Sequence, residues 1–162
     1  MSPKPIDKQV SAREGYALWA SHYDVHDNPM TTMVEHVLSQ SSIDLGGAKV
    51  LELGCGTGRN ARTLLNSGVG SYLGLDSSPE MLEVAGAAAC DVIQFEERDL
   101  QGHWWTGLES FDLCLISLVL EHFENIEEVI NAATHVVRPG GLLWILEIHS
   151  QLRGEGVQAH VT

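Results

Sequence analysis

One short stretch of the 162-residue chain combines an acidic side chain with three glycines and could hold a small ligand. The apolar run 50–53 is short enough for a buried strand, and Glu52 lies within it. Gly54, Gly56 and Gly58 follow at alternate positions. Glycine permits a tight turn and lets a ligand approach the backbone closely. An acid in a buried strand is costly unless it is paired or faces a ligand, so Glu52 is a candidate binding residue.

A second acidic candidate ends the next apolar run, at 72–76. A strand, a glycine turn and a helix form the first unit of a doubly wound α/β sheet, and an acid ending the second strand hydrogen-bonds ribose hydroxyls in such folds. Asp76 therefore fits a nicotinamide-dependent oxidoreductase. The glycine spacing does not, because dinucleotide-binding turns have G-x-G-x-x-G and Arg59 stands where their third glycine would be.

The rest of the chain alternates helical and strand patterns. This alternation predicts an α/β fold with a mostly parallel, Rossmann-like sheet and helices on both faces. Apolar spacing and cap residues predict helices at 11–23, 29–40, 59–66, from Ser78 onward and at 125–137. Apolar runs predict further strands at 91–95, 111–117 and 142–148.

Four segments together resemble the class I S-adenosylmethionine-dependent methyltransferases. They are E-x-G-x-G-x-G at 52–58, Y-x-x-W-A-x-x-Y-D at 16–24, the F-D pair opening the 111–117 strand, and R-P-G-G at 138–141. The resemblance covers about residues 11–150. It implies that the chain binds S-adenosylmethionine and transfers its methyl group to a small-molecule acceptor.

The resemblance also implies roles for individual residues. Glu52 serves the amino-acid moiety of the cofactor, Asp76 the ribose hydroxyls and Asp99 the adenine amino group. Ser117 and Leu118 border the methionine end, and Tyr16 or Tyr23 covers the cofactor. The expected cofactor-binding set is Glu52, Gly54, Cys55, Gly56, Gly58, Asp76, Ser77, Met81, Asp99, Leu100, Ser117, Leu118, Tyr16 and Tyr23.

Several of these residues have a simpler interpretation. Tyr16 and Tyr23 could only pack their helix on the domain. Asp99 could cap the turn that follows it. Trp104 and Trp105 line the adenine pocket or merely pack.

A general base is needed only for some acceptors, such as a hydroxyl or a protonated amine. His122 is the first candidate because histidine titrates near neutrality, and Glu121 is the second. Each could instead cap a helix start or be solvated. His22, His26 and His149 are too widely distributed in the sequence to indicate a metal site, and none is expected.

Composition narrows the possible partners. The net charge of −13 repels phosphate backbones and anionic membrane surfaces, so neither nucleic acid nor a membrane is an expected partner. The three cysteines are unclustered and do not suggest disulfides, which indicates a cytoplasmic protein. The first ten residues do not read as a signal peptide.

The length indicates one domain. We expect an N-terminal helical lid over 1–47, a cofactor-binding core over 48–150 and a tail over 151–162. The family's domain usually continues with a helix and two more strands, so the last strand would be a bare edge through which two copies could pair. The alternative to an enzyme is a cofactor-binding module or inactive partner subunit without a complete substrate site.

Overall fold

The computed structural model describes residues 29–108 and 110–148. The elements in chain order are α2 (Pro29–Ser39), β1 (Lys49–Leu53), α3 (Arg59–Asn66), β2 (Ser71–Asp76), α4 (Pro79–Ala85), the 3₁₀ helix η1 (Gly86–Ala88), β3 (Ile93–Glu97), β4 (Phe111–Ser117), the 3₁₀ helix η2 (Leu120–His122), α5 (Ile126–Val136) and β5 (Val137–Leu146).

The five strands form one sheet in the order β3-β2-β1-β4-β5, and all neighbouring pairs run parallel. The chain builds outward from β1 to β3 and then returns to the other side of β1 with β4. Ligands in such sheets bind outside the carboxyl ends of the strands, at this point of reversal. This is the doubly wound α/β arrangement that the sequence predicts.

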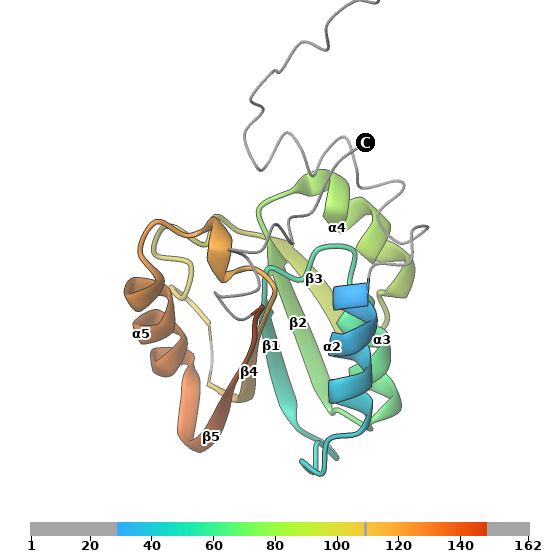
Figure 1. Cartoon of the computed structure of the whole chain (residues 1–162). Coiled ribbons are helices and arrows are strands. Elements are labelled where there is room, and N and C mark those ends of the chain that lie inside the picture. The colour runs from blue at the N-terminus through green and yellow to red at the C-terminus, as the bar shows by residue number, and fades with distance from the viewer. Residues whose placement is uncertain (1–28, 109, 149–162) are drawn as a thin grey trace, which may run out of the picture.

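Helices cover both faces of the sheet, with α2 and α3 on one side and α5 on the other (Figure 1). Side chains of a strand alternate between the two faces. Val50 accordingly joins the core beside α2 and α3, whereas Leu51 and Leu53 join the core that includes α5. Glu52 shares its face with Val50, so its carboxyl group points toward α3.

Two strands, β3 and β5, differ from their predicted bounds by more than one residue. β3 spans Ile93–Glu97 rather than 91–95, because Ile93 is the partner of Tyr72 in β2. An edge strand tolerates the acids at its end. β5 begins at Val137, directly after α5, instead of at residue 142. The pairing with β4 shifts register around R-P-G-G, which lies inside the strand as an irregularity.

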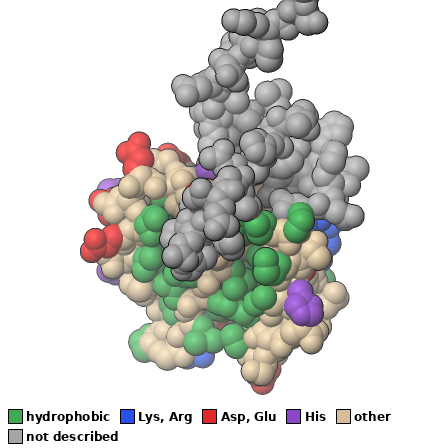
Figure 2. Space-filling view, in the orientation of Figure 1, with side chains coloured by type: hydrophobic (Ala, Val, Ile, Leu, Met, Phe, Trp, Pro, Cys, Tyr) green, Lys and Arg blue, Asp and Glu red, His purple; other side chains and the backbone are tan. Residues whose placement is uncertain are grey.

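β5 ends the sheet within the described residues and presents Leu142 and Ile145, which are 45% and 37% exposed. Figure 2 shows hydrophobic side chains gathered on the face between α5 and α2, with acidic side chains toward α5. Within 29–108 and 110–148, no helix has the length and hydropathy needed to cross a membrane. The association of two copies through β5 stays a prediction.

Gly74 in β2 tests how closely the sheet packs under the glycine turn. A Cβ atom there would lie 2.8 Å from both Cys55 Sγ and Phe95 Cδ1. We therefore expect Gly74→Ala to lower the free energy of unfolding by about 1–3 kcal/mol, the usual cost of overpacking, in urea titrations.

Gly86 supplies the matched control. Its φ is −54° and an added Cβ would meet no atom within 4 Å. Gly86→Ala should leave stability unchanged or raise it slightly, because alanine restricts the unfolded chain. Equal effects of the two substitutions would contradict this packing.

Candidate active site

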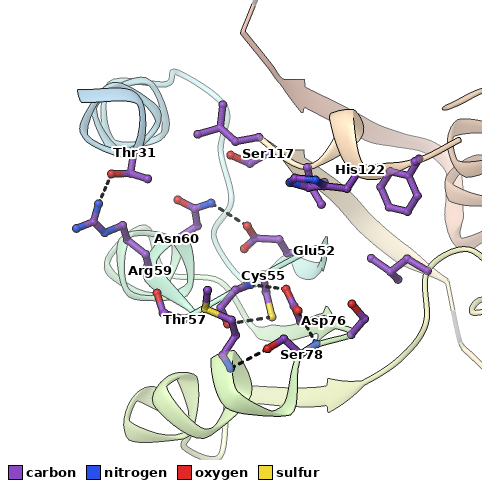
Figure 3. Close-up of a pocket in the computed structure, with 18 of the residues that line it drawn as sticks. Thr31, Glu52, Cys55, Thr57, Arg59, Asn60, Asp76, Ser78, Ser117 and His122 are labelled. Carbon is purple, nitrogen blue, oxygen red and sulfur yellow. Dashed lines mark hydrogen bonds between the residues drawn. The ribbon is translucent and has the colours of Figure 1, made fainter. Parts of the chain in front are cut away.

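A pocket of about 230 Å³ lies at the carboxyl ends of the central strands (Figure 3). The turn after β1, the end of β2, the loop after β3 and the segment after β4 all contribute to it, and α2 closes one side. Most predicted site residues come together here, namely Glu52, Gly54, Cys55, Gly56, Asp76, Ser77, Met81, Asp99, Leu100, Ser117, Leu118 and His122.

Of the predicted residues that the structure describes, two are not part of this lining. Gly58 packs away from the pocket, since a Cβ there would lie 2.7 Å from Phe95 Cζ. The side chain of Glu121 is 41% exposed, beside His122 rather than in the pocket. Tyr16 and Tyr23 lie outside the described residues.

Gly54 and Gly56 of the glycine turn have different surroundings and different structural roles. Both Gly54 and Gly56 have a positive φ, which favours glycine. A Cβ on Gly54 would lie 2.4 Å from Val119 Cγ2, so this glycine lets the segment after β4 pack on the turn. A Cβ on Gly56 would meet no atom within 4 Å. The space beside the Gly56 backbone is therefore open, and its role in ligand binding stays a prediction.

Glu52 is 1% exposed and its two carboxyl oxygens are each hydrogen-bonded. Asn60 Nδ2 from α3 donates to one oxygen at 2.8 Å, and the Tyr72 hydroxyl from β2 donates to the other at 2.5 Å. The pKa of Glu52 is raised to about 7, mainly by burial and to a lesser extent by the charge of Asp76, while the two hydrogen bonds partly offset the rise. At physiological pH, Glu52 therefore populates both its neutral and its charged form.

The groups around Glu52 stay protonated. Burial and the neighbouring Glu52 raise the pKa of the Tyr72 hydroxyl well above its usual value, so Tyr72 remains a donor. The same causes raise the pKa of the Cys55 thiol. Cys55 is therefore a small apolar side chain in the turn and not a thiolate nucleophile.

Asp76 joins two parts of the pocket. One carboxylate oxygen accepts a hydrogen bond from Gly56 N at 2.8 Å and the other accepts one from Ser78 N at 2.9 Å. Ser78 in turn caps α4 by accepting from Met81 N, as its position before Pro79 predicts. The carboxylate thus ties the glycine turn to the start of α4.

Asp99 makes a local bond and also faces the pocket. Its Oδ1 accepts from Gln101 N at 2.9 Å, which is the capping role considered from the sequence. A carboxylate oxygen has further lone pairs, so this bond leaves acceptor capacity for a ligand.

Several lining residues were missed from the sequence. Arg59, at the start of α3, donates to the Thr31 hydroxyl and forms an ion pair with Glu35 Oε1 at 3.1 Å, which holds α2 over the pocket. Asn60, the next residue, was also missed, and so were four further polar lining residues, namely Thr31, Thr57, Ser78 and Gln101. The only signal for Arg59 and Asn60 was their place in the first turn after the glycines.

The segment after β4 brings His122 and Phe123 to the pocket. It begins at Leu118, whose φ of 54° makes it the one non-glycine residue with a positive φ in the described chain. Such a conformation is strained and is often found at functional sites. His122 Nε2 lies 3.8 Å from Glu121 Oε1.

A second hollow of about 850 Å³ lies between α5 and the segment after β3. Trp104 and Trp105 line this hollow and not the first pocket. Trp104 is 3% exposed and belongs to the core that includes α5. Packing is therefore the structural role of this tryptophan.

Comparison with known proteins agrees with this arrangement. Residues 51–145 match the family described as "Methyltransferase domain", which is more than half of the chain. The chain belongs to this family. The class I methyltransferase assignment and fold predicted from its motifs are confirmed.

Individual proteins of known name or structure share about a third or less of their aligned residues with this chain. The chain is 29% identical over 119 residues to the ubiquinone biosynthesis O-methyltransferase of Shewanella sp. (strain ANA-3), covering 72% of this chain and 50% of that protein. It is 33% identical over 101 residues to the demethylmenaquinone methyltransferase of Tropheryma whipplei (strain Twist), covering 62% and 42%. A structure of a DhpI–SAH complex has a TM-score of 0.73 at 27% identity, covering 86% and 69%. The chain spans half or less of the curated relatives it matches.

The raised pKa of Glu52 makes a prediction about stability. A folded-state pKa of about 7, against an ordinary value of 4.5, means that the folded chain retains a proton that the unfolded chain loses. The free energy of unfolding should therefore fall as pH rises from 4.5 to 7, by roughly 3 kcal/mol from this group. Glu52→Gln removes this contribution.

We expect urea titrations between pH 4.5 and 8 to show the variant gaining stability relative to the natural chain as pH rises. Glu83→Gln, on the exposed side of α4, controls for the general loss of a negative charge. If the free energies of unfolding of the natural chain and Glu52→Gln changed in parallel with pH, the raised pKa of Glu52 would be contradicted.

Proposed function

We propose that this chain binds S-adenosylmethionine in the pocket and transfers its methyl group to a small-molecule acceptor. The observation that carries the proposal is the buried Glu52 beneath a glycine turn, in the same pocket as Asp76. Membership of the methyltransferase domain family supports it, as do the relatives named as a ubiquinone biosynthesis O-methyltransferase and a demethylmenaquinone methyltransferase.

The charges of the pocket fit this cofactor. S-adenosylmethionine carries an ammonium group, a sulfonium and a carboxylate. Glu52 would accept a hydrogen bond from the ammonium group. Asp76 would accept hydrogen bonds from the ribose hydroxyls, and Asp99 would accept one from the adenine amino group. Arg59, the only lysine or arginine of the described lining, would attract the carboxylate.

The cofactor supplies an activated methyl group, and transfer forms a bond from the nucleophile to the methyl carbon while the electron pair of the broken carbon–sulfur bond stays on sulfur. The protein must orient the acceptor and exclude water. For a hydroxyl or protonated amine, His122 would take the proton that the nucleophile loses. Glu121 remains the second candidate, although its side chain lies outside the pocket lining.

Binding of S-adenosylhomocysteine, measured by calorimetry, tests the cofactor site. We expect saturable binding that Asp76→Asn weakens by about 1–3 kcal/mol, the usual cost of a lost buried hydrogen bond. Asp76→Asn is preferred to alanine because the carboxylate also binds Gly56 N and Ser78 N, and the amide keeps one acceptor oxygen. Asp91→Ala, an exposed acid before β3, should bind normally.

A folded chain that does not bind S-adenosylhomocysteine would overturn the proposal. Equal binding by the natural chain and Asp76→Asn would overturn the ribose role of Asp76 only. Unfolding midpoints of all variants, measured alongside, identify any loss caused by misfolding.

His122→Ala tests the proposed base. Methyl transfer from labelled S-adenosylmethionine is measured to a panel of small phenols, thiols and amines. For a hydroxyl acceptor we expect turnover to fall by about 10²–10⁴, the usual contribution of a general base, with cofactor affinity within a few-fold. His36→Ala, on the exposed side of α2, is the control. Full-rate turnover by His122→Ala would remove the base assignment.

A further inference from the structure

We propose that Glu147, the first residue after β5, is a positioning residue for this reaction: its carboxylate holds the segment 118–123 in the conformation that brings His122 and Phe123 into the pocket. This role in catalysis rests on the proposed methyl transfer. The contacts that carry it belong to the chain itself and can be tested without any cofactor.

Two hydrogen bonds define the contact. Glu147 Oε1 accepts from the backbone N–H of Val119 at 2.7 Å and from that of Leu120 at 2.8 Å. Bonds to a carboxylate are shorter and stronger than those between neutral groups. The side chain thus reaches from the edge strand to the segment after β4, which lies on the pocket.

The two residues held by Glu147 are also the ones that hold the pocket residues. The carbonyl oxygen of Val119 accepts from His122 N at 3.0 Å, and that of Leu120 accepts from Phe123 N at 3.3 Å. Each of the two pocket residues is therefore hydrogen-bonded to a residue that the carboxylate also binds. Loss of the carboxylate would loosen both at once.

The start of the segment explains why such a hold is needed. Leu118 has a φ of 54°, a strained conformation that persists only where the surroundings enforce it. Its N–H donates to Leu146 O at 2.9 Å, directly before Glu147 in the chain. The side chain of Val119 packs against Gly54, so the same segment also touches the glycine turn.

Three variants separate positioning from general stability. Glu147→Ala removes the acceptor. Glu147→Gln keeps a carbonyl oxygen with two lone pairs, which can accept both bonds without the charge. Glu83→Ala removes an exposed acid from α4. Amide hydrogen exchange and the chemical shifts of the His122 ring are followed by NMR on the full chain without cofactor.

We expect Glu147→Ala to speed exchange at residues 119, 120, 122 and 123 by at least about tenfold and to change the chemical shifts of the His122 ring. Amides of β1 and β4 should keep their protection. Glu147→Gln should restore most of both signals, and Glu83→Ala should change neither. With a working acceptor, Glu147→Ala should lower kcat while KM for S-adenosylmethionine stays within a few-fold.

Natural protection and unchanged chemical shifts of the His122 ring in Glu147→Ala would overturn the proposal. A uniform loss of protection that includes β1 and β4 would overturn it as well, because Glu147 would then stabilise the fold in general. Failure of S-adenosylhomocysteine to bind the natural chain would instead overturn the proposed function, since the exchange measurement needs no ligand.

Discussion

Glu52 lies between the central strand and the first helix after it, with Asn60 and Tyr72 on its two oxygens. A carboxyl group at 1% exposure is costly to ionise, so the fold must either hold it neutral or give its charge a partner. The pKa of about 7 shows that the two hydrogen bonds only partly offset the burial. A cation bound in the pocket would supply the missing compensation, and this requirement links the core of the sheet to the ligand.

Two other carboxylates hold the walls of the same pocket through the backbone. Asp76 binds the glycine turn and the start of α4, and Glu147 binds the segment after β4. Both stand at or just beyond the carboxyl end of a strand, where loops need acceptors for N–H groups that the sheet does not pair. Gly54 brings the turn and the segment into contact, because only a residue without Cβ leaves room for Val119. The pocket is therefore built from loops fixed to one another and to the sheet.

The strands and most of the pocket could be predicted from the sequence because their signals are local. Apolar runs marked β1, β2 and β4, and Ser78 with Pro79 marked the start of α4. The position of β3 and the start of β5 are set by pairing with neighbouring strands. The spacing of apolar residues along the sequence carries no information about that pairing. The same holds for Tyr72 and Glu147, whose partners lie far away in the chain: nothing local to Tyr72 indicates that it donates to Glu52.

Calorimetry of S-adenosylhomocysteine binding in two buffers of different ionisation enthalpy counts the protons released. It therefore tests directly whether a bound cation compensates the charge of the buried Glu52. At pH 6.5 a group with a pKa of about 7 is mostly protonated, and pairing with the ligand's ammonium group would ionise it. We expect release of about half a proton or more at pH 6.5, less release at pH 8, and loss of this release in Glu52→Gln. Binding without proton release at either pH would contradict it.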